Sequence, residues 1–295
     1  MIFFYLKGPF HEFLAKKRLE GKIIGFVPTM GALHQGHISL INAAKQSCDL
    51  VVCSIFVNPT QFNNLQDLEK YPRTLDSDSK MLEQAGCDVL FAPEVSEMYT
   101  AKELELKALG QEDKSWMEGK NVSFGTLDKV MEGTQRPGHF NGVAQVVSKL
   151  FRIVRPHKAF FGQKDFQQLA IIKSMVNQLL INVEIIPCPI LREPDGLAMS
   201  SRNVRLTPEQ RKIVPAISQL LFKIKELQAT HSPAQLKTIV SEQFARQTEM
   251  KLAYFEIVDG ETLTSVNDFN QHKEVVACIA VEIGSLRLID NVVLK

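Results

Sequence analysis

The order of apolar and polar positions divides the chain into two parts. Through the first two-thirds, short apolar runs alternate with segments in which apolar residues recur at helical spacing. The runs, mostly β-branched or aromatic, predict strands at 23–27, 50–56, 89–91, 159–161 and 183–186. The intervening patterns predict helices near 39–45, 77–85, 142–154 and 166–180. Strands separated by helices favour an α/β fold in which helices cover both faces of a parallel sheet.

The pattern changes after Pro187 and Pro189, which make a plausible hinge because residues before proline avoid helix. Capping boxes at 207–210 and 232–235, each with proline at the first helical position, predict two helices, the first interrupted near Pro215. Apolar segments at 252–258, 275–281 and 286–294 predict a small antiparallel sheet. For 295 residues two domains are the natural expectation, at 1–186 and, as a smaller α+β unit, at 187–295.

One polar segment, residues 99–122, fits neither pattern and contains the only tryptophan, Trp116. We expect it to be a long, irregular excursion between sheet elements.

Composition narrows the functional classes. The 34 basic residues nearly balance the 33 acidic ones, so no bulk charge recruits nucleic acid or a membrane. Five scattered cysteines without a Cys-x-x-Cys pair are typical of reduced thiols, and the apolar start ends at Lys7, too early for a signal sequence or membrane span. We therefore expect a cytoplasmic protein.

The segment most informative about chemistry is Pro-Thr-Met-Gly-Ala-Leu-His-Gln-Gly-His at 28–37, between a predicted strand and a predicted helix. A glycine-bearing turn in that position directs backbone N–H groups and the positive helix end toward a phosphate. His34 and His37 would lie beside it and donate hydrogen bonds in either charge state. This is a His-x-Gly-His arrangement rather than a Walker or Gly-x-Gly-x-x-Gly loop. The alternatives are an incidental surface turn and a metal site, which lacks a third ligand nearby.

Further polar segments follow other predicted strands. At 162–165, Lys164 would supply positive charge to phosphates, while Asp165 would cap the next helix or bind ribose hydroxyls. The loop at 195–203 carries Ser200, Ser201 and Arg202 and either closes over a triphosphate or is a solvated linker.

Neutral amides supply a different chemistry. Gln61 and Gln168 suit hydroxyls and a carboxylate, as in a small hydroxy acid, although surface glutamines are common. The turn at 133–140 either borders the site or only connects elements.

Six segments together carry a resemblance: 27–37, 54–62, 71–74, 136–140, 161–168 and 195–203. Their sequences and order resemble the pantoate–β-alanine ligase (pantothenate synthetase) family. The matches cover most of the span from 23 to 210, whereas the last third agrees only in general character.

The resemblance implies a Rossmann-like ATP- and pantoate-binding domain of the nucleotidyltransferase type, with a smaller lid domain, in a homodimer. It implies that ATP and pantoate first give pantoyl adenylate and pyrophosphate. The β-alanine amine then attacks the adenylate, giving pantothenate and AMP. Magnesium is expected on the phosphates.

The resemblance also assigns residues by position. It implies catalytic roles for His37, His34 and Lys164, and pantoate contacts for Gln61 and Gln168, with Gln61 also bordering β-alanine. It places in the ATP site Met30, Gly31, Ala32, Leu33, His34, Gln35, Gly36, His37, Gly162, Gln163, Lys164, Asp165, Leu191, Met199, Ser200, Ser201 and Arg202. It assigns no residue as a metal ligand. Gln163 departs from the family, which often has glutamate there.

Rival interpretations share parts of this pattern. Adenylyl transfer to a mononucleotide and a fragment of a class I aminoacyl-tRNA synthetase use the same His-x-Gly-His chemistry, but near-zero net charge and the lack of an evident anticodon domain disfavour the second. A non-enzymatic ATP-sensing module would not need so many groups for phosphate.

Overall fold

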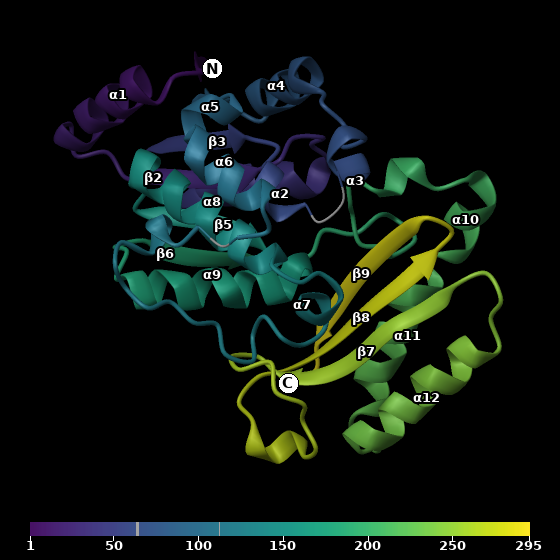
Figure 1. Cartoon of the computed structure of the whole chain (residues 1–295). Coiled ribbons are helices and arrows are strands. Elements are labelled where there is room, and N and C mark those ends of the chain that lie inside the picture. Colours follow the sequence, from purple (N-terminus) through teal and green to yellow (C-terminus); the bar gives the residue numbers. More distant parts are fainter. Residues whose placement is uncertain (63–64, 112) are drawn as a thin grey trace.

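The computed structural model describes residues 1–62, 65–111 and 113–295. The described part of the chain contains two separate β-sheets (Figure 1). The larger sheet has six parallel strands in the order β1-β4-β3-β2-β5-β6. Their bounds are β1 Ile2–Phe4, β2 Ile24–Thr29, β3 Leu50–Ile55, β4 Val89–Phe91, β5 Lys158–Gly162 and β6 Glu184–Cys188. The predicted parallel α/β sheet is confirmed, and each of its five predicted strands is present.

Helices cover both faces of this sheet because successive strand residues point to opposite sides. On one face, Val27 and Phe160 pack with apolar residues of α2 (Gln35–Ser47) and α4 (Leu75–Gln84). On the other, Phe26 and Phe161 pack with residues of α1 (Lys7–Leu19), α8 (His139–Val154) and α9 (Phe166–Leu179). Strands buried on both faces explain why they read as continuous apolar runs.

The amino-terminal elements were not predicted. β1 is a three-residue edge strand, and α1 is fixed mainly by Phe10 and Leu14, which are fully buried and four residues apart. Three other short helices also lie outside the predicted pattern: α3 Leu65–Glu69, α5 Val95–Met98 and α7 Glu132–Gln135.

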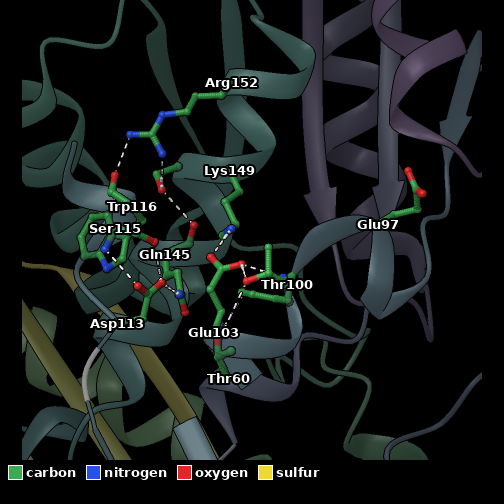
Figure 2. A network of polar contacts seen from close by, with 12 residues as sticks. Thr60, Glu97, Thr100, Glu103, Asp113, Ser115, Trp116, Gln145, Lys149 and Arg152 are labelled. Atoms are coloured by element: carbon green, nitrogen blue, oxygen red, sulfur yellow. Dashed lines mark hydrogen bonds and ion pairs between the residues drawn. The ribbon is translucent and has the colours of Figure 1, made fainter. Parts of the chain in front are cut away.

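The segment 99–122 is more regular than expected and is bound to α8 (Figure 2). It contains helix α6 (Ala101–Ala108), which begins with a capping box between Thr100 and Glu103, and it buries Trp116 in the main core. Three side chains of α8 hold the described part of the segment: Lys149 on Glu103 (2.5 Å), Gln145 on Asp113 (2.7 Å) and Arg152 on the carbonyl of Trp116 (2.6 Å).

The carboxy-terminal unit packs helices on the predicted antiparallel sheet, and the first of the two predicted helices is divided in two at Pro215. Its strands are β7 Lys251–Asp259, β8 Val275–Ile283 and β9 Leu286–Val293 (the yellow-green to yellow ribbons of Figure 1). Capping boxes at Thr207 and Ser232 begin α10 (Pro208–Ile213) and α12 (Pro233–Ala245), and α11 (Ala216–Leu227) begins after the interruption at Pro215. β6 continues through Pro187 to Cys188, which lies between the two prolines of the expected hinge, and the division into domains at 186/187 stays a prediction.

Candidate active site

A cavity of about 210 Å³ opens at the carboxyl ends of β2, β5 and β6. Chain order in the sheet reverses between β2 and β5, and ligands of such sheets bind at that reversal. We call it the histidine cavity; its lining includes Thr29, Met30, His34, Gly36, His37, Tyr71, Gly162, Lys164, Asp165, Gln168, Leu191, Met199, Ser200, Ser201 and Arg202. The fold therefore brings together residues from four of the six matching segments and from the intervening 189–191.

His34 and His37 lie against each other at the start of α2, with ring centroids 4.1 Å apart. The backbone N–H of Gly36 donates to Nδ1 of His34 (3.1 Å), and the backbone N–H of His34 donates to Nδ1 of His37 (3.2 Å). A Cβ on residue 36 would come within 2.8 Å of the His34 ring, so glycine is required for this ring to fold over the helix end.

Both histidines are neutral near pH 7. Burial is the main cause that lowers the pKa of His34 to about 4 and that of His37 to about 3. Because each Nδ1 accepts a hydrogen bond, the single proton of each neutral ring lies on Nε2. The pair consequently presents two neutral N–H donors, a state that the sequence left open.

The turn preceding α2 is fixed by a residue that the sequence analysis missed. Asp78 of α4, 2% exposed, accepts hydrogen bonds from the backbone N–H groups of Ala32 and Leu33, both at 2.9 Å. Gly31 and Ala32 adopt positive φ angles of 79° and 51° in this turn. These two N–H groups are therefore bound to a carboxylate within the protein, and helical spacing at 77–85 gave no sign of it.

Across the histidine cavity from His34 and His37, residues of β9 hold the segment that carries Lys164. Asn291, 4% exposed, donates from Nδ2 to the carbonyls of both Gln163 and Lys164 (2.9 Å each). Its neighbour Asp290 pairs with Arg192 through contacts of 2.6 and 3.0 Å, and Arg192 belongs to the strap between Leu191 and Met199. Two consecutive residues of β9 thus fix the turn at Gln163–Asp165, which we call the lysine turn, and the strap. Neither residue was singled out from the sequence.

A second cavity, of about 350 Å³, adjoins the first and lies between the two units. We call it the arginine cavity, since Arg136, Arg202, Arg205 and Arg287 line it. The two cavities share Lys164, Asp165, Gln168, Ser200 and Arg202. His139 and Phe140 also line the arginine cavity, so the turn at 133–140 borders the site.

The two predicted pantoate ligands occupy different positions. Gln168 lines both cavities. Gln61, 7% exposed, donates to the sulfur of Met30 (2.9 Å) and accepts from Asn58 Nδ2 (3.1 Å), and it is absent from the described lining of either cavity. Asn58 in turn accepts a hydrogen bond from Tyr99 (2.8 Å), which connects the excursion at 99–122 to Gln61.

Several predicted ATP ligands are likewise not among the described lining residues: Gly31, Ala32, Leu33, Gln35 and Gln163. Gln35 is exposed at the first position of α2, and the carbonyl of Gln163 is bound by Asn291. Their nucleotide contacts stay predictions.

Carboxylates are scarce at the histidine cavity. Asp165 is the one acidic side chain in its described lining, lies 4.0 Å from Lys164, and makes no capping bond to α9. Across the described ranges no three His, Cys, Asp or Glu side chains are grouped to hold a metal ion.

In the same ranges no helix is both long and apolar enough to span a membrane.

Fold and site define a Rossmann-like α/β protein whose cavity, lined by neutral histidines, lysine and arginine, suits an anionic ligand. The family model described as Pantoate-beta-alanine ligase matches residues 7–293. The chain belongs to the pantoate–β-alanine ligase family and is a ligase.

The sequences of individual relatives align with nearly the whole of this chain. Pantothenate synthetase of Bacteroides fragilis is 50% identical over 282 residues, covering 96% of this chain and 95% of its own. That of Porphyromonas gingivalis is 49% identical over 281 residues, covering 95% of both chains.

Solved structures give the same assignment. A pantothenate synthetase from Thermus thermophilus has a TM-score of 0.87 at 38% identity, covering 99% of both chains. A pantoate-beta-alanine ligase from Francisella tularensis, complexed with Beta-gamma ATP and beta-alanine, has a TM-score of 0.75 at 35% identity, covering 100% of this chain and 98% of its own.

Proposed function

We propose that this protein condenses pantoate with β-alanine, using ATP and passing through pantoyl adenylate, with release of AMP and pyrophosphate. The observation that carries the proposal is the meeting of His34, His37, Lys164, Gln168 and Arg202 around two adjoining cavities. These residues come from separate family motifs, and membership of the family supplies the reaction.

In the first half-reaction a pantoate carboxylate oxygen attacks the α-phosphorus of ATP. Pantoate is already ionised near pH 7, so this step needs charge stabilisation rather than a base. The Nε2–H groups of His34 and His37 donate to the phosphate oxygens on which negative charge grows. Lys164 and Arg202 offset the repulsion between the two anions.

In the second half-reaction the amine of β-alanine attacks the acyl carbon of the adenylate and AMP leaves. The amine must lose a proton before or during attack. His34 and His37 are poor acceptors for it, since both have a pKa near 3 to 4 and already accept hydrogen bonds at Nδ1.

Magnesium is proposed to accompany ATP. Mg²⁺ commonly uses one or two carboxylates together with substrate phosphates, and Asp165 fits that role as a carboxylate beside Lys164 at both cavities. When bound, the ion neutralises phosphate charge.

A homodimer and a cytoplasmic location also stay proposals. Analytical ultracentrifugation at several protein concentrations tests the homodimer.

The proposal is tested by ATP–pyrophosphate exchange with a panel of carboxylic acids. Exchange that requires pantoate is the expected result, since adenylation is reversible only with the correct acid. Dependence on an amino acid instead would favour a synthetase, and no exchange with any acid would favour a binding module.

A further inference from the structure

The histidine cavity alone is too small for the proposed substrates. Small-molecule sites usually measure about 300–1,000 Å³, and this one measures about 210 Å³. The arginine cavity adds about 350 Å³ and is continuous with it along Lys164, Gln168, Ser200 and Arg202. Since Lys164, Ser200 and Arg202 face the phosphates in the proposed function, the far end of the triphosphate points toward the arginine cavity.

The charge of the arginine cavity is positive after its internal pairs are accounted for. Arg287 binds Glu132 through two contacts of 2.8 and 2.9 Å, and Asp290 is neutralised by Arg192. Arg202 and Arg205 contribute further positive charge to the lining, and Lys164 and Asp165 lie at the boundary between the cavities.

Arg205 is placed to act together with Arg202. Both belong to the tight turn around η4 (Asn203–Arg205), where the N–H of Arg205 donates to the carbonyl of Arg202 (3.0 Å). Side chains three residues apart in such a turn project from the same side. Within the described ranges neither guanidinium has an ion-pair partner inside 4.0 Å.

We propose that the arginine cavity is a pyrophosphate site, in which Arg205 joins Arg202 in holding the β- and γ-phosphates and then the released pyrophosphate. The inference rests on the proposed function and deepens it. As the carboxylate oxygen bonds to the α-phosphorus, the bond from that phosphorus to the bridging oxygen breaks. Its electron pair stays on pyrophosphate, and no proton is transferred. The anion formed then lies among arginines, away from the acyl phosphate.

Calorimetric titration with inorganic pyrophosphate, in the presence of Mg²⁺, tests the site without requiring turnover. Arg205→Gln removes the charge, Arg205→Lys keeps it, and Arg246→Gln is the control because Arg246 is exposed and lies outside the described lining of both cavities. We expect Arg205→Gln to weaken binding about threefold to tenfold, Arg205→Lys to recover most of it, and the control to match the unmodified protein.

The same variants are then compared in pantoate-dependent exchange, where Arg205→Gln should raise the KM for pyrophosphate more than that for pantoate. If the unmodified protein exchanges with pantoate but Arg205→Gln equals the control in both assays, the pyrophosphate site is refuted and the proposed function stands. If the unmodified protein shows no pantoate-dependent exchange, the proposed function fails and this inference fails with it.

Discussion

At the scale of single residues, the structure determines which form of each histidine acts. Nδ1 of His34 and of His37 accepts a backbone hydrogen bond, so both rings offer Nε2–H while remaining neutral. A neutral donor stabilises a developing phosphate charge without having to be deprotonated, and its strength does not change across physiological pH.

We expect His37→Ala to slow pantoate-dependent pyrophosphate release about tenfold to thousandfold, because a transition-state donor is lost. His37→Gln should restore part of the rate, since its amide offers an N–H near the position of Nε2. Single-turnover measurement of pyrophosphate checks both variants.

His231→Ala is the matched control, because His231 lies after α11, away from both cavities. Equal rates for His37→Gln and His37→Ala would contradict a role as a neutral donor. An unchanged rate for His37→Ala would remove His37 from the mechanism altogether.

Gln168 and Gln61 should behave differently when replaced by alanine. Gln168 lines both cavities, so its loss should raise the pantoate KM about tenfold to hundredfold and the ATP KM less. Loss of Gln61 should have the same sign and also lower the melting temperature, because Met30 and Asn58 lose a buried partner. Initial rates and thermal unfolding check this, with exposed Gln219→Ala as control. A larger effect on ATP than on pantoate would place Gln168 elsewhere.

At the scale of elements, the site is assembled by supports distant in sequence. α4 holds the turn before α2 through Asp78, and β9 holds the lysine turn through Asn291. The side chains proposed to meet ATP thus depend on side chains that do not line the histidine cavity.

Asn291→Ala should lower the adenylation rate about tenfold and raise the ATP KM, because the carbonyls of Gln163 and Lys164 lose their common donor. Asn291→Asp keeps the size but directs a carboxylate at the two carbonyls, so it should be slower still. Single-turnover rates and melting temperatures at pH 8 test this order.

A role limited to packing would give the reverse order, with Asn291→Asp the more active variant because it preserves volume. Exposed Asn270→Asp provides the control for the charge change itself.

The sequence was informative where the signal was local. Apolar runs located the strands of the parallel sheet after β1, and capping boxes located the starts of α10 and α12. It could not reveal Asp78, Asn291 or the pair Arg192–Asp290, because each acts across 45 to 128 residues of chain and resembles an ordinary polar residue at its own position. The irregular appearance of 99–122 misled for a related reason: Glu103 of α6 and Asp113 beyond it are held by polar contacts to α8, which apolar periodicity does not reveal.

At the scale of the whole molecule, buried neutral histidines make stability depend on pH. Burial lowers the pKa of His139 to about 4, as it does for His34, while that of His37 falls to about 3. In the unfolded chain each would titrate near 6.5. Between these values the unfolded chain binds more protons than the folded one, so acid favours unfolding.

The free energy of unfolding should therefore fall as the pH is lowered from about 6.5 to 4.5, with a slope of up to about 1.4 kcal/mol per pH unit for each histidine. Urea unfolding at intervals of half a pH unit measures it. The double variant His34→Gln/His37→Gln should flatten the slope, whereas His231→Gln should not. A stability that stays constant over this interval would contradict neutral, buried imidazoles.

The hydrogen bonds that Asn291 donates to the lysine turn also have a consequence for biosynthesis. Asn291 binds a carbonyl 127 residues earlier in the chain, at Lys164. At a ribosomal rate of roughly 5–20 residues per second, the lysine turn emerges about 6–25 s before the residue that secures it. Nascent chains that already contain both histidines and Lys164 would thus hold the lysine turn without its donor until β9 has been translated, so we expect them to adenylate pantoate more slowly than the finished chain.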